Sequence, residues 1–182
     1  SWVTYWKPIG EGKFLSLDTL TAQSTSTTNF NNTAPTTSVF SVNSNDTNQS
    51  TLDYIAYCFY SVDGYSKVGE WKNNNSTDGS FVFTGFRPAF IFLKNYDNSE
   101  GWYLVDKKRS PVNIGPPLGQ FLGGNLSVVE GNVNASTATI DFLSNGFKIR
   151  TTSAGSGEVS FGTRNYLYLA IADTPVKYSN AR

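Results

Sequence analysis

Residues 81–106 read F-V-F-T-G-F-R-P-A-F-I-F-L-K-N-Y-D-N-S-E-G-W-Y-L-V-D, and this stretch decides the fold. Its runs at 81–84, 90–93 and 102–105 are aromatic, aliphatic and β-branched, which is typical of strands. Gly85-Phe86-Arg87-Pro88 predicts a corner between the first two strands, because Gly and Pro interrupt regular structure. Residues 95–101 are rich in Asn, Asp, Ser and Gly, which tolerate the geometry of a tight turn. We therefore expect the core hairpin of an antiparallel β domain.

The rest of the chain continues this β pattern, and its apolar residues do not recur at helical spacing. The run Leu52–Tyr60 is apolar on both faces, so we expect a central strand that is covered on both sides. Asn145-Gly146 is a strong hairpin signal. The fold class is therefore all-β, an antiparallel β-sandwich. The further strands that we expect are 1–7, 14–17, 39–42, 138–143, 147–151 and 165–172.

Composition excludes several functional classes. Among 182 residues, 15% are charged and the formal net charge is zero, so no basic patch for nucleic acid is evident. No window has about 18 consecutive apolar residues, so a transmembrane helix is not expected. The single cysteine, Cys58, lies in an apolar run and is predicted to be a buried small side chain.

Catalysis is not expected. Histidine is absent, which removes Ser-His-Asp and Cys-His catalysis and most zinc sites. A glycosidase needs two positioned carboxylates, whereas most carboxylates of this chain lie in predicted turns. The acidic residues considered for such a pair are Asp63, Asp78, Asp97, Glu100, Asp106, Glu130, Asp141 and Glu158.

The two halves of the chain resemble each other. Nothing in the first half corresponds to residues 81–94, so we expect the chain to start inside a repeat of a longer array. Alternatively, a neighbouring subunit supplies the missing strands. Either arrangement leaves an unpaired sheet edge in the first half, which predicts contact with another chain. The matching pairs are 2–7 with 102–107, 38–42 with 139–143, and 51–59 with 163–171.

This repeat divides the chain into three parts. We predict that residues 1–62 are the C-terminal part of a preceding β module and that residues 63–80 are a connecting segment. Residues 81–182 are predicted to form a complete β-sandwich module. The connecting segment is punctuated by Gly64, Gly69 and Asp78-Gly79.

Two loops carry the residue types that bind sugars, which are a planar aromatic with amides and carboxylates beside it. Trp71 is the preferred aromatic, because it falls in the connecting segment and no strand pattern buries it. Trp102 is expected to begin a core strand instead. The alternative role for Trp71 is packing between modules or subunits. The candidate ligand-binding residues are Trp71, Asn73, Asn75, Asp78, Tyr96, Asp97 and Asn98.

No cofactor is expected. The loops 73–78 and 97–100 are rich in oxygen ligands of the kind that calcium prefers. However, neither carries the D-x-D-x-D-G spacing of a calcium loop, so solvated turns are favoured over a structural Ca²⁺ and no metal ligands are predicted.

Several motifs resemble the repeat modules of large tail-fibre-like proteins of marine bacteriophages. The resemblance covers most of the chain, and it implies a lectin-like jelly-roll sandwich built from related β modules. It also implies an extracellular place on the virion surface. The motifs are Y-x-A-Y-C-F at 54–59, G-Y-S-K-x-G at 64–69, the run at 75–90, I-D-F-L-S-N-G-F-K at 140–148, and the segments 32–36 and 177–182.

The expected function is host attachment by a non-enzymatic virion fibre module that binds a cell-surface glycan. The alternative is a purely structural fibre or decoration module that binds only other virion subunits, and a free lectin or carbohydrate-active enzyme is a third hypothesis. Expected partners are copies of the chain itself, a trimer by analogy with phage fibres, or other virion proteins. Neither nucleic acid nor membrane insertion is expected. Exposed aromatics beside carboxylates in a groove would favour attachment.

Overall fold

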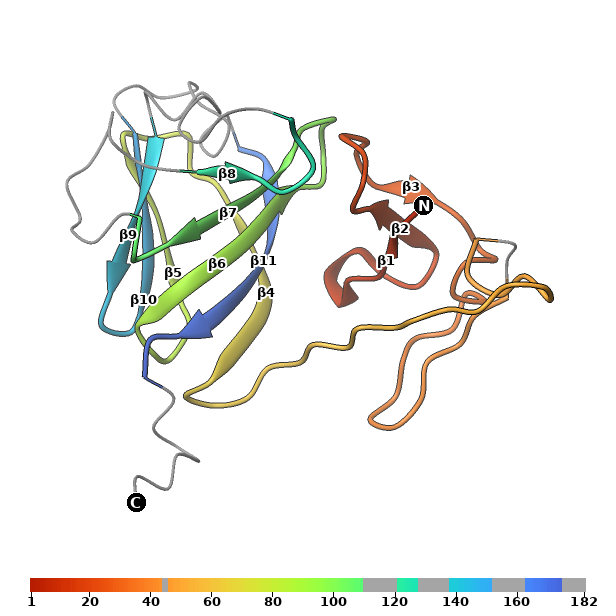
Figure 1. Ribbon diagram of the computed structural model, residues 1–182. Coiled ribbons are helices and arrows are strands. Elements are labelled where there is room, and N and C mark those ends of the chain that lie inside the picture. Colours follow the sequence, from red (N-terminus) through yellow and green to blue (C-terminus); the bar gives the residue numbers. More distant parts are fainter. Residues whose placement is uncertain (44–45, 110–120, 128–137, 152–162, 175–182) are drawn as a thin grey trace, which may run out of the picture.

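The computed structural model of the chain describes residues 1–43, 46–109, 121–127, 138–151 and 163–174 (Figure 1). These residues form an antiparallel β-sandwich with a small third sheet beside it, so the all-β prediction is confirmed. The jelly-roll connection pattern stays a prediction. The elements are β1 (Val3–Thr4), the 3₁₀ helix η1 (Lys7–Ile9), β2 (Lys13–Ser16), β3 (Ser24–Thr25), β4 (Ser66–Lys72), β5 (Asp78–Phe83), β6 (Pro88–Asn95), β7 (Trp102–Asp106), β8 (Leu122–Gly123), β9 (Ala138–Leu143), β10 (Gly146–Thr151) and β11 (Asn165–Ala172).

One layer of the sandwich is a five-stranded sheet in the order β4-β11-β6-β7-β8. The strand β11 lies in its interior and pairs antiparallel with the edge strand β4 on one side and with β6 on the other. Tyr168 of β11 faces Gly69 across one pair and Leu93 across the other. A Cβ at Gly69 would lie 2.9 Å from the Tyr168 ring, so glycine at this position makes room for the tyrosine.

The other layer is a three-stranded sheet in the order β5-β10-β9. The predicted hairpin at Asn145-Gly146 is confirmed, because Gly146 of β10 pairs with Leu143 of β9 across a two-residue loop. A Cβ at Gly146 would lie 2.2 Å from the carbonyl oxygen of Val82. Any side chain at position 146 would therefore clash with the backbone of β5, so glycine allows β5 and β10 to approach this closely. The predicted corner after β5 is also confirmed, with Gly85 at φ +85°. It carries the chain from this sheet to β6 in the other.

The main core lies between the two sheets. Inward side chains of the five-stranded sheet include Ile91, Leu93 and Tyr166, and they meet Phe147 and Ile149 of the three-stranded sheet. All five are completely buried. Alternation along each strand places these residues on one face, as the pattern of residues 81–106 predicts.

The five-stranded sheet is apolar on its outer face too. Trp102, Leu167 and Leu169 point outward there and pack against the N-terminal segment. Their partners are Trp6, which precedes η1, and Leu15 of β2 in the N-terminal sheet, whose order is β1-β2-β3. The indole N–H of Trp102 donates a hydrogen bond to the carbonyl oxygen of Ser16 at 2.9 Å. The N-terminal segment thus covers part of the sandwich rather than forming half of another one.

Two strands predicted in the first half are absent from the described residues. Neither 39–42 nor 52–60 belongs to any of the three sheets, so both predictions are wrong. Residues 52–60 run as an extended segment that joins the N-terminal sheet to β4 (Figure 1). Every residue from 51 to 60 is exposed, including Cys58, which was predicted to be buried. None of the strands in the described part of the chain covers this segment.

The segment 63–80 is more than a connection, which corrects the prediction for it. It contains the whole of β4, an edge strand of the five-stranded sheet, and the start of β5. Trp71 therefore belongs to a strand and not to a loop. The sequence repeat does not correspond to a structural repeat either, because 51–59 belongs to none of the described sheets whereas its counterpart 163–171 includes most of the strand β11.

Candidate functional site

Trp71 is not available to a ligand. Only 7% of its surface is exposed, and its ring stacks on Tyr166 and meets Phe147 edge-on, with ring centroids 4.7 Å and 5.6 Å apart. It points into the core because it lies on the inner face of β4, the face of Gly69 two residues earlier, opposite Tyr166. The predicted alternative role was packing between modules or subunits. Trp71 does pack against other side chains, but it does so inside the sandwich. Trp102 begins the core strand β7, as predicted, and is completely buried.

The other predicted residues of this loop have local structural roles. Asn73 is buried, and its backbone N–H donates to the carbonyl oxygen of Arg164 at 2.9 Å. Asn75 adopts a left-handed conformation at φ +53°, which asparagine tolerates better than most residues. The Asp78 carboxylate forms an ion pair with Lys148 at 2.7 Å, and this hydrogen-bonded partner lowers the pKa of Asp78.

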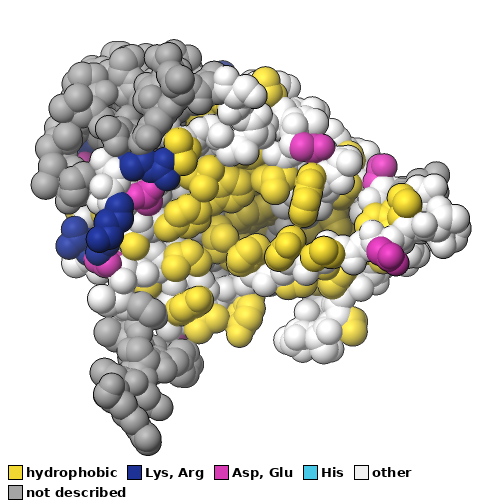
Figure 2. Space-filling model, viewed as in Figure 1, with side chains coloured by type: hydrophobic (Ala, Val, Ile, Leu, Met, Phe, Trp, Pro, Cys, Tyr) yellow, Lys and Arg dark blue, Asp and Glu magenta, His cyan; other side chains and the backbone are white. Residues whose placement is uncertain are grey.

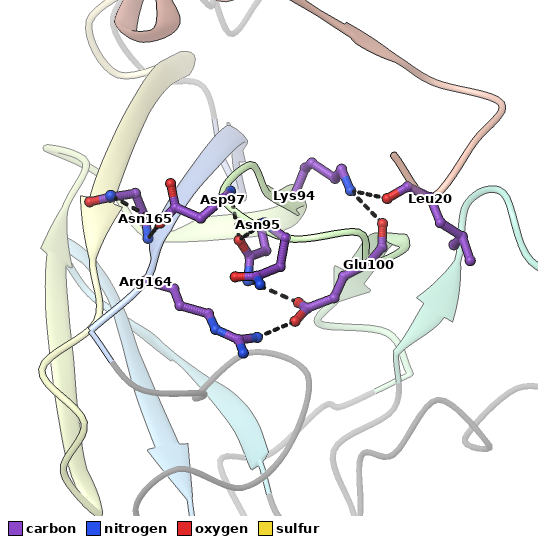
Figure 3. Close-up of polar contacts among 8 residues, drawn as sticks. Leu20, Lys94, Asn95, Asp97, Glu100, Arg164 and Asn165 are labelled. Carbon is purple, nitrogen blue, oxygen red and sulfur yellow. Dashed lines mark hydrogen bonds and ion pairs between the residues drawn. The ribbon is translucent and has the colours of Figure 1, made fainter. Parts of the chain in front are cut away.

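The second predicted group, at the turn between β6 and β7, is held in a polar network (Figure 3). Asp97 accepts hydrogen bonds from the backbone N–H and the side-chain amide of Asn165, at 2.7 Å and 3.0 Å. The side-chain oxygen of Asn95 accepts the backbone N–H groups of Asp97 and Asn98, which closes the turn. The predicted residues Asp97 and Asn98 therefore do come together, but they do so as parts of a turn.

Tyr96 extends this network toward β4. Its hydroxyl donates a hydrogen bond of 2.8 Å to the carboxylate of Glu70, and its ring packs against the outer-face core. Burial and the hydrogen bond to Glu70 raise the pKa of Tyr96 above its ordinary range. The ring is thus partly covered and its hydroxyl is engaged.

Three charged residues of the network were not among the predicted site residues. Glu100 forms an ion pair with Arg164 and also accepts a hydrogen bond of 3.0 Å from the Asn95 side chain. Lys94 is completely buried, and its ammonium group donates to the carbonyl oxygens of Leu20 and Glu100. Figure 3 shows the Lys94 side chain reaching from β6 to the N-terminal segment at Leu20. Arg164 and Glu100 are 64 residues apart in sequence, so no local pattern links them.

This arrangement locks the turn, the start of β11 and the N-terminal segment to one another. The described carboxylates of Asp78, Asp97, Glu100, Asp106 and Asp141 each accept from a basic or amide group. Within the described ranges, no group of three or more His, Cys, Asp or Glu side chains could hold a metal ion. Glu130 and Glu158 lie outside those ranges. No helix of the described chain is long and apolar enough to cross a bilayer.

The exposed aromatic surface lies elsewhere, on the segment 52–60. Its large apolar side chains are between 45% and 76% exposed, and Figure 2 shows hydrophobic side chains gathered across the middle of the same view of the molecule. Isolated exposed apolar residues are normal, but a continuous run marks an interaction surface. The side chains concerned are Leu52, Tyr54, Ile55, Tyr57, Phe59 and Tyr60.

One neighbour adds to this surface. Trp2 is 55% exposed and stacks on Tyr57, with ring centroids 6.3 Å apart and an angle of 23° between the ring planes. The backbone N–H of Trp2 donates to the Asp18 carboxylate at 3.2 Å. An exposed aromatic pair therefore lies close to an exposed carboxylate.

Comparison with known proteins gives one match. No curated protein and no solved structure matches the chain. A family model does match residues 1–175, which is nearly the whole chain. The chain therefore belongs to the family described as a domain of unknown function, DUF7483.

Proposed function

We propose that the chain is a non-catalytic structural module of a virion fibre, which binds other protein subunits of the same assembly. The single observation that carries the protein-binding part is the exposed apolar segment 52–60, which no sheet of the described residues covers. The virion setting is supported by the resemblance of motifs such as 64–69 and 75–90 to phage fibre modules.

The geometry favours protein binding over the glycan site first expected. A sugar platform needs a ring face that is open to solvent. Trp71 and Trp102 are both buried, and Tyr96 donates its hydroxyl to Glu70. Asp97 and Asn98 are used within their own turn. The predicted ligand residues Trp71, Tyr96, Asp97 and Asn98 are thus engaged within the chain.

Protein association also accounts for the segment thermodynamically. Burying apolar surface contributes about 25 cal/mol per Å², and an extended segment with six large apolar side chains offers much of it. Interfaces between permanent partners resemble a domain core and are rich in aromatic residues. Residues 52–60 have that composition, with four aromatic side chains.

A glycan-binding attachment module is the second candidate. The observation that favours it is the stacked and exposed pair of Trp2 and Tyr57 beside Asp18. In that case the sugar would lie on the Trp2 ring, and its hydroxyls would reach the carboxylate.

Two measurements on the purified chain distinguish the two candidate functions. Sedimentation equilibrium over a wide dilution series gives the molar mass, and a glycan array gives sugar binding. We expect reversible association with no glycan signal. A chain that stays monomeric throughout and binds a sugar, with the signal lost in Trp2→Ala, would overturn the structural function and establish attachment.

A further inference from the structure

We propose that two copies of the chain associate by antiparallel pairing of their segments 52–60 about a two-fold axis through Tyr57. This inference rests on the proposed function, because it names the partner and the contact of the same surface. The segment is apolar and extended, and it lies outside every sheet that the described residues form. A second copy is the partner that its sequence fits.

The sequence of the segment is self-complementary. Read outward from Tyr57, the residues pair by class in both directions, whereas an arbitrary apolar strand would not. Antiparallel pairing about Tyr57 sets residue i of one copy opposite residue 114 − i of the other. The resulting pairs are Tyr54 with Tyr60, Ile55 with Phe59, Ala56 with Cys58, and Tyr57 with its own copy.

Each of these pairs is a favourable cross-strand contact. Aromatic–aromatic and aromatic–β-branched pairs contribute roughly 0.2–1 kcal/mol each relative to a pair of alanines. The two small side chains, Ala56 and Cys58, fall opposite each other, so they leave room for the rings on both sides. An isologous contact of this kind closes on itself and limits assembly to a pair at this surface.

The position of the charged residue in the segment is consistent with this register. The only charged residue from 52 to 60 is Asp53. The pairing sets Asp53 opposite Ser61, so the two Asp53 carboxylates lie at opposite ends of the ribbon rather than side by side. A parallel arrangement would place them next to each other, and like charges directly opposite are destabilising.

A local contact also prevents the segment from pairing with the edge strand β4 of its own chain. The segment ends at an antiparallel bridge between Val62 and Ser66, which could extend into a hairpin with the outer edge of β4. The hydroxyl of Ser61 prevents this, because it accepts the backbone N–H of Val68 at 3.1 Å and donates to the carbonyl oxygen of Val68 at 3.3 Å. Both edge groups of Val68 are thus occupied, and residues 52–60 leave the sheet with their large side chains exposed.

The register is tested by disulfide trapping in the full chain, with Cys58→Ser as the common background. Residues directly opposite have Cβ atoms about 4.5–5.5 Å apart, close to the spacing of a disulfide. Ile55→Cys copies mixed with Phe59→Cys copies should form a mixed dimer under mild oxidation. Neither variant alone should cross-link, because two copies of one such position lie about 13 Å apart along the ribbon. Tyr57→Cys alone should cross-link.

Two further variants separate this contact from association in general. Tyr57→Asp sets two carboxylates opposite each other on the axis, so it should reduce the molar mass in sedimentation to that of the monomer. Tyr65→Asp changes an exposed tyrosine outside the segment and should leave the mass unchanged. Circular dichroism of both variants confirms that each is folded.

The outcomes are distinct. Association that survives Tyr57→Asp, or trapping without the expected register, overturns the two-fold pairing and leaves the structural function standing. A wild-type chain that is monomeric at every concentration also overturns the two-fold pairing. If that monomer in addition binds a sugar through Trp2, the structural function is overturned as well. Mixed-dimer trapping together with loss of association in Tyr57→Asp supports both.

Discussion

Trp71 and Tyr166 stack face to face in the core of the sandwich, with ring centroids 4.7 Å apart and an angle of 12° between the ring planes. They lie directly opposite each other on β4 and β11, so the contact joins an edge strand to its interior neighbour. The Trp71 ring also meets Phe147 of the facing sheet at 5.6 Å. One side chain thus ties three strands together.

Trp71→Ala should therefore destabilise the fold severely. Large-to-small changes of a buried Phe or Trp cost about 3–5 kcal/mol of the free energy of unfolding, because they leave a cavity. Urea unfolding followed by fluorescence or circular dichroism measures the loss. Trp2→Ala is the matched control, since Trp2 is 55% exposed and should cost far less. Equal losses in the two variants would contradict the core position of Trp71.

Gly146→Ala tests the close approach of β5 to β10. The added methyl group would lie 2.2 Å from the carbonyl oxygen of Val82, so the backbone of β5 has to move. Overpacking of this kind costs typically about 1–3 kcal/mol. Gly12→Ala serves as the control, because the nearest atom there is the end of the Asn32 side chain at 3.2 Å. Chemical denaturation of both variants gives the comparison, and no difference would show that the strands relax freely.

Most of the sandwich could be predicted from sequence because its signals are local. The alternation in residues 147–151 and the turn residues at 95–101 act within a few positions, and the structure has a strand and a turn there. Residues 165–172 form the predicted strand. The same local logic fails at Trp71. Asn73, Asn74 and Asn75 follow it closely and suggested a loop. In the structure, however, Trp71 and Gly69 lie two residues apart on the inner face of the strand β4.

The segment 52–60 could not be placed from sequence for a different reason. Apolar residues on both faces indicate that burial of the segment is favourable. They do not indicate which chain packs against it. Its counterpart around β11 has β4 and β6 as neighbours, whereas 52–60 has no strand beside it in the described chain. The ion pair of Glu100 with Arg164 was missed for a related reason, because only the folded sheet brings residues so distant in sequence together.

Glu100→Gln tests the polar network at the β6–β7 turn. Glu100 pairs with Arg164 and accepts from Asn95, and its side chain is 14% exposed. Hydrogen bonds to charged groups contribute about 1.5–3 kcal/mol, and the partly exposed Arg164 places the expected loss near the lower end. Glu70→Gln is the control, since Glu70 is exposed and accepts a hydrogen bond from Tyr96 at the margin of the network. A larger loss in Glu70→Gln would mean that the turn is not the locking point.

Asp106 should make the fold sensitive to acid. Burial alone would raise the pKa of this carboxyl, but hydrogen bonds from the backbone and guanidinium of Arg109 and from the Lys108 backbone together hold the pKa below its ordinary value. The stabilisation is therefore present above the unfolded pKa of about 3.9 and is lost as the pH falls through the lower folded pKa.

Asp106→Asn removes this titration while keeping an oxygen that accepts the backbone N–H groups. The difference in the free energy of unfolding between wild type and variant should be largest near neutral pH and should shrink in acid. Urea titrations at a series of pH values measure it. A difference that stays constant, or grows, as the pH falls would contradict the lowered pKa of Asp106.

Cys58 reports whether the segment 52–60 is accessible in the native chain. The structure leaves Cys58 exposed, so a thiol reagent should modify it fully in dilute native protein without denaturant. Association through the segment should slow the modification as the protein concentration rises, because Cys58 then faces Ala56 of the second copy. Tyr57→Asp removes the association and should abolish this concentration dependence. A thiol that reacts only after urea is added would show that Cys58 is buried in the native chain.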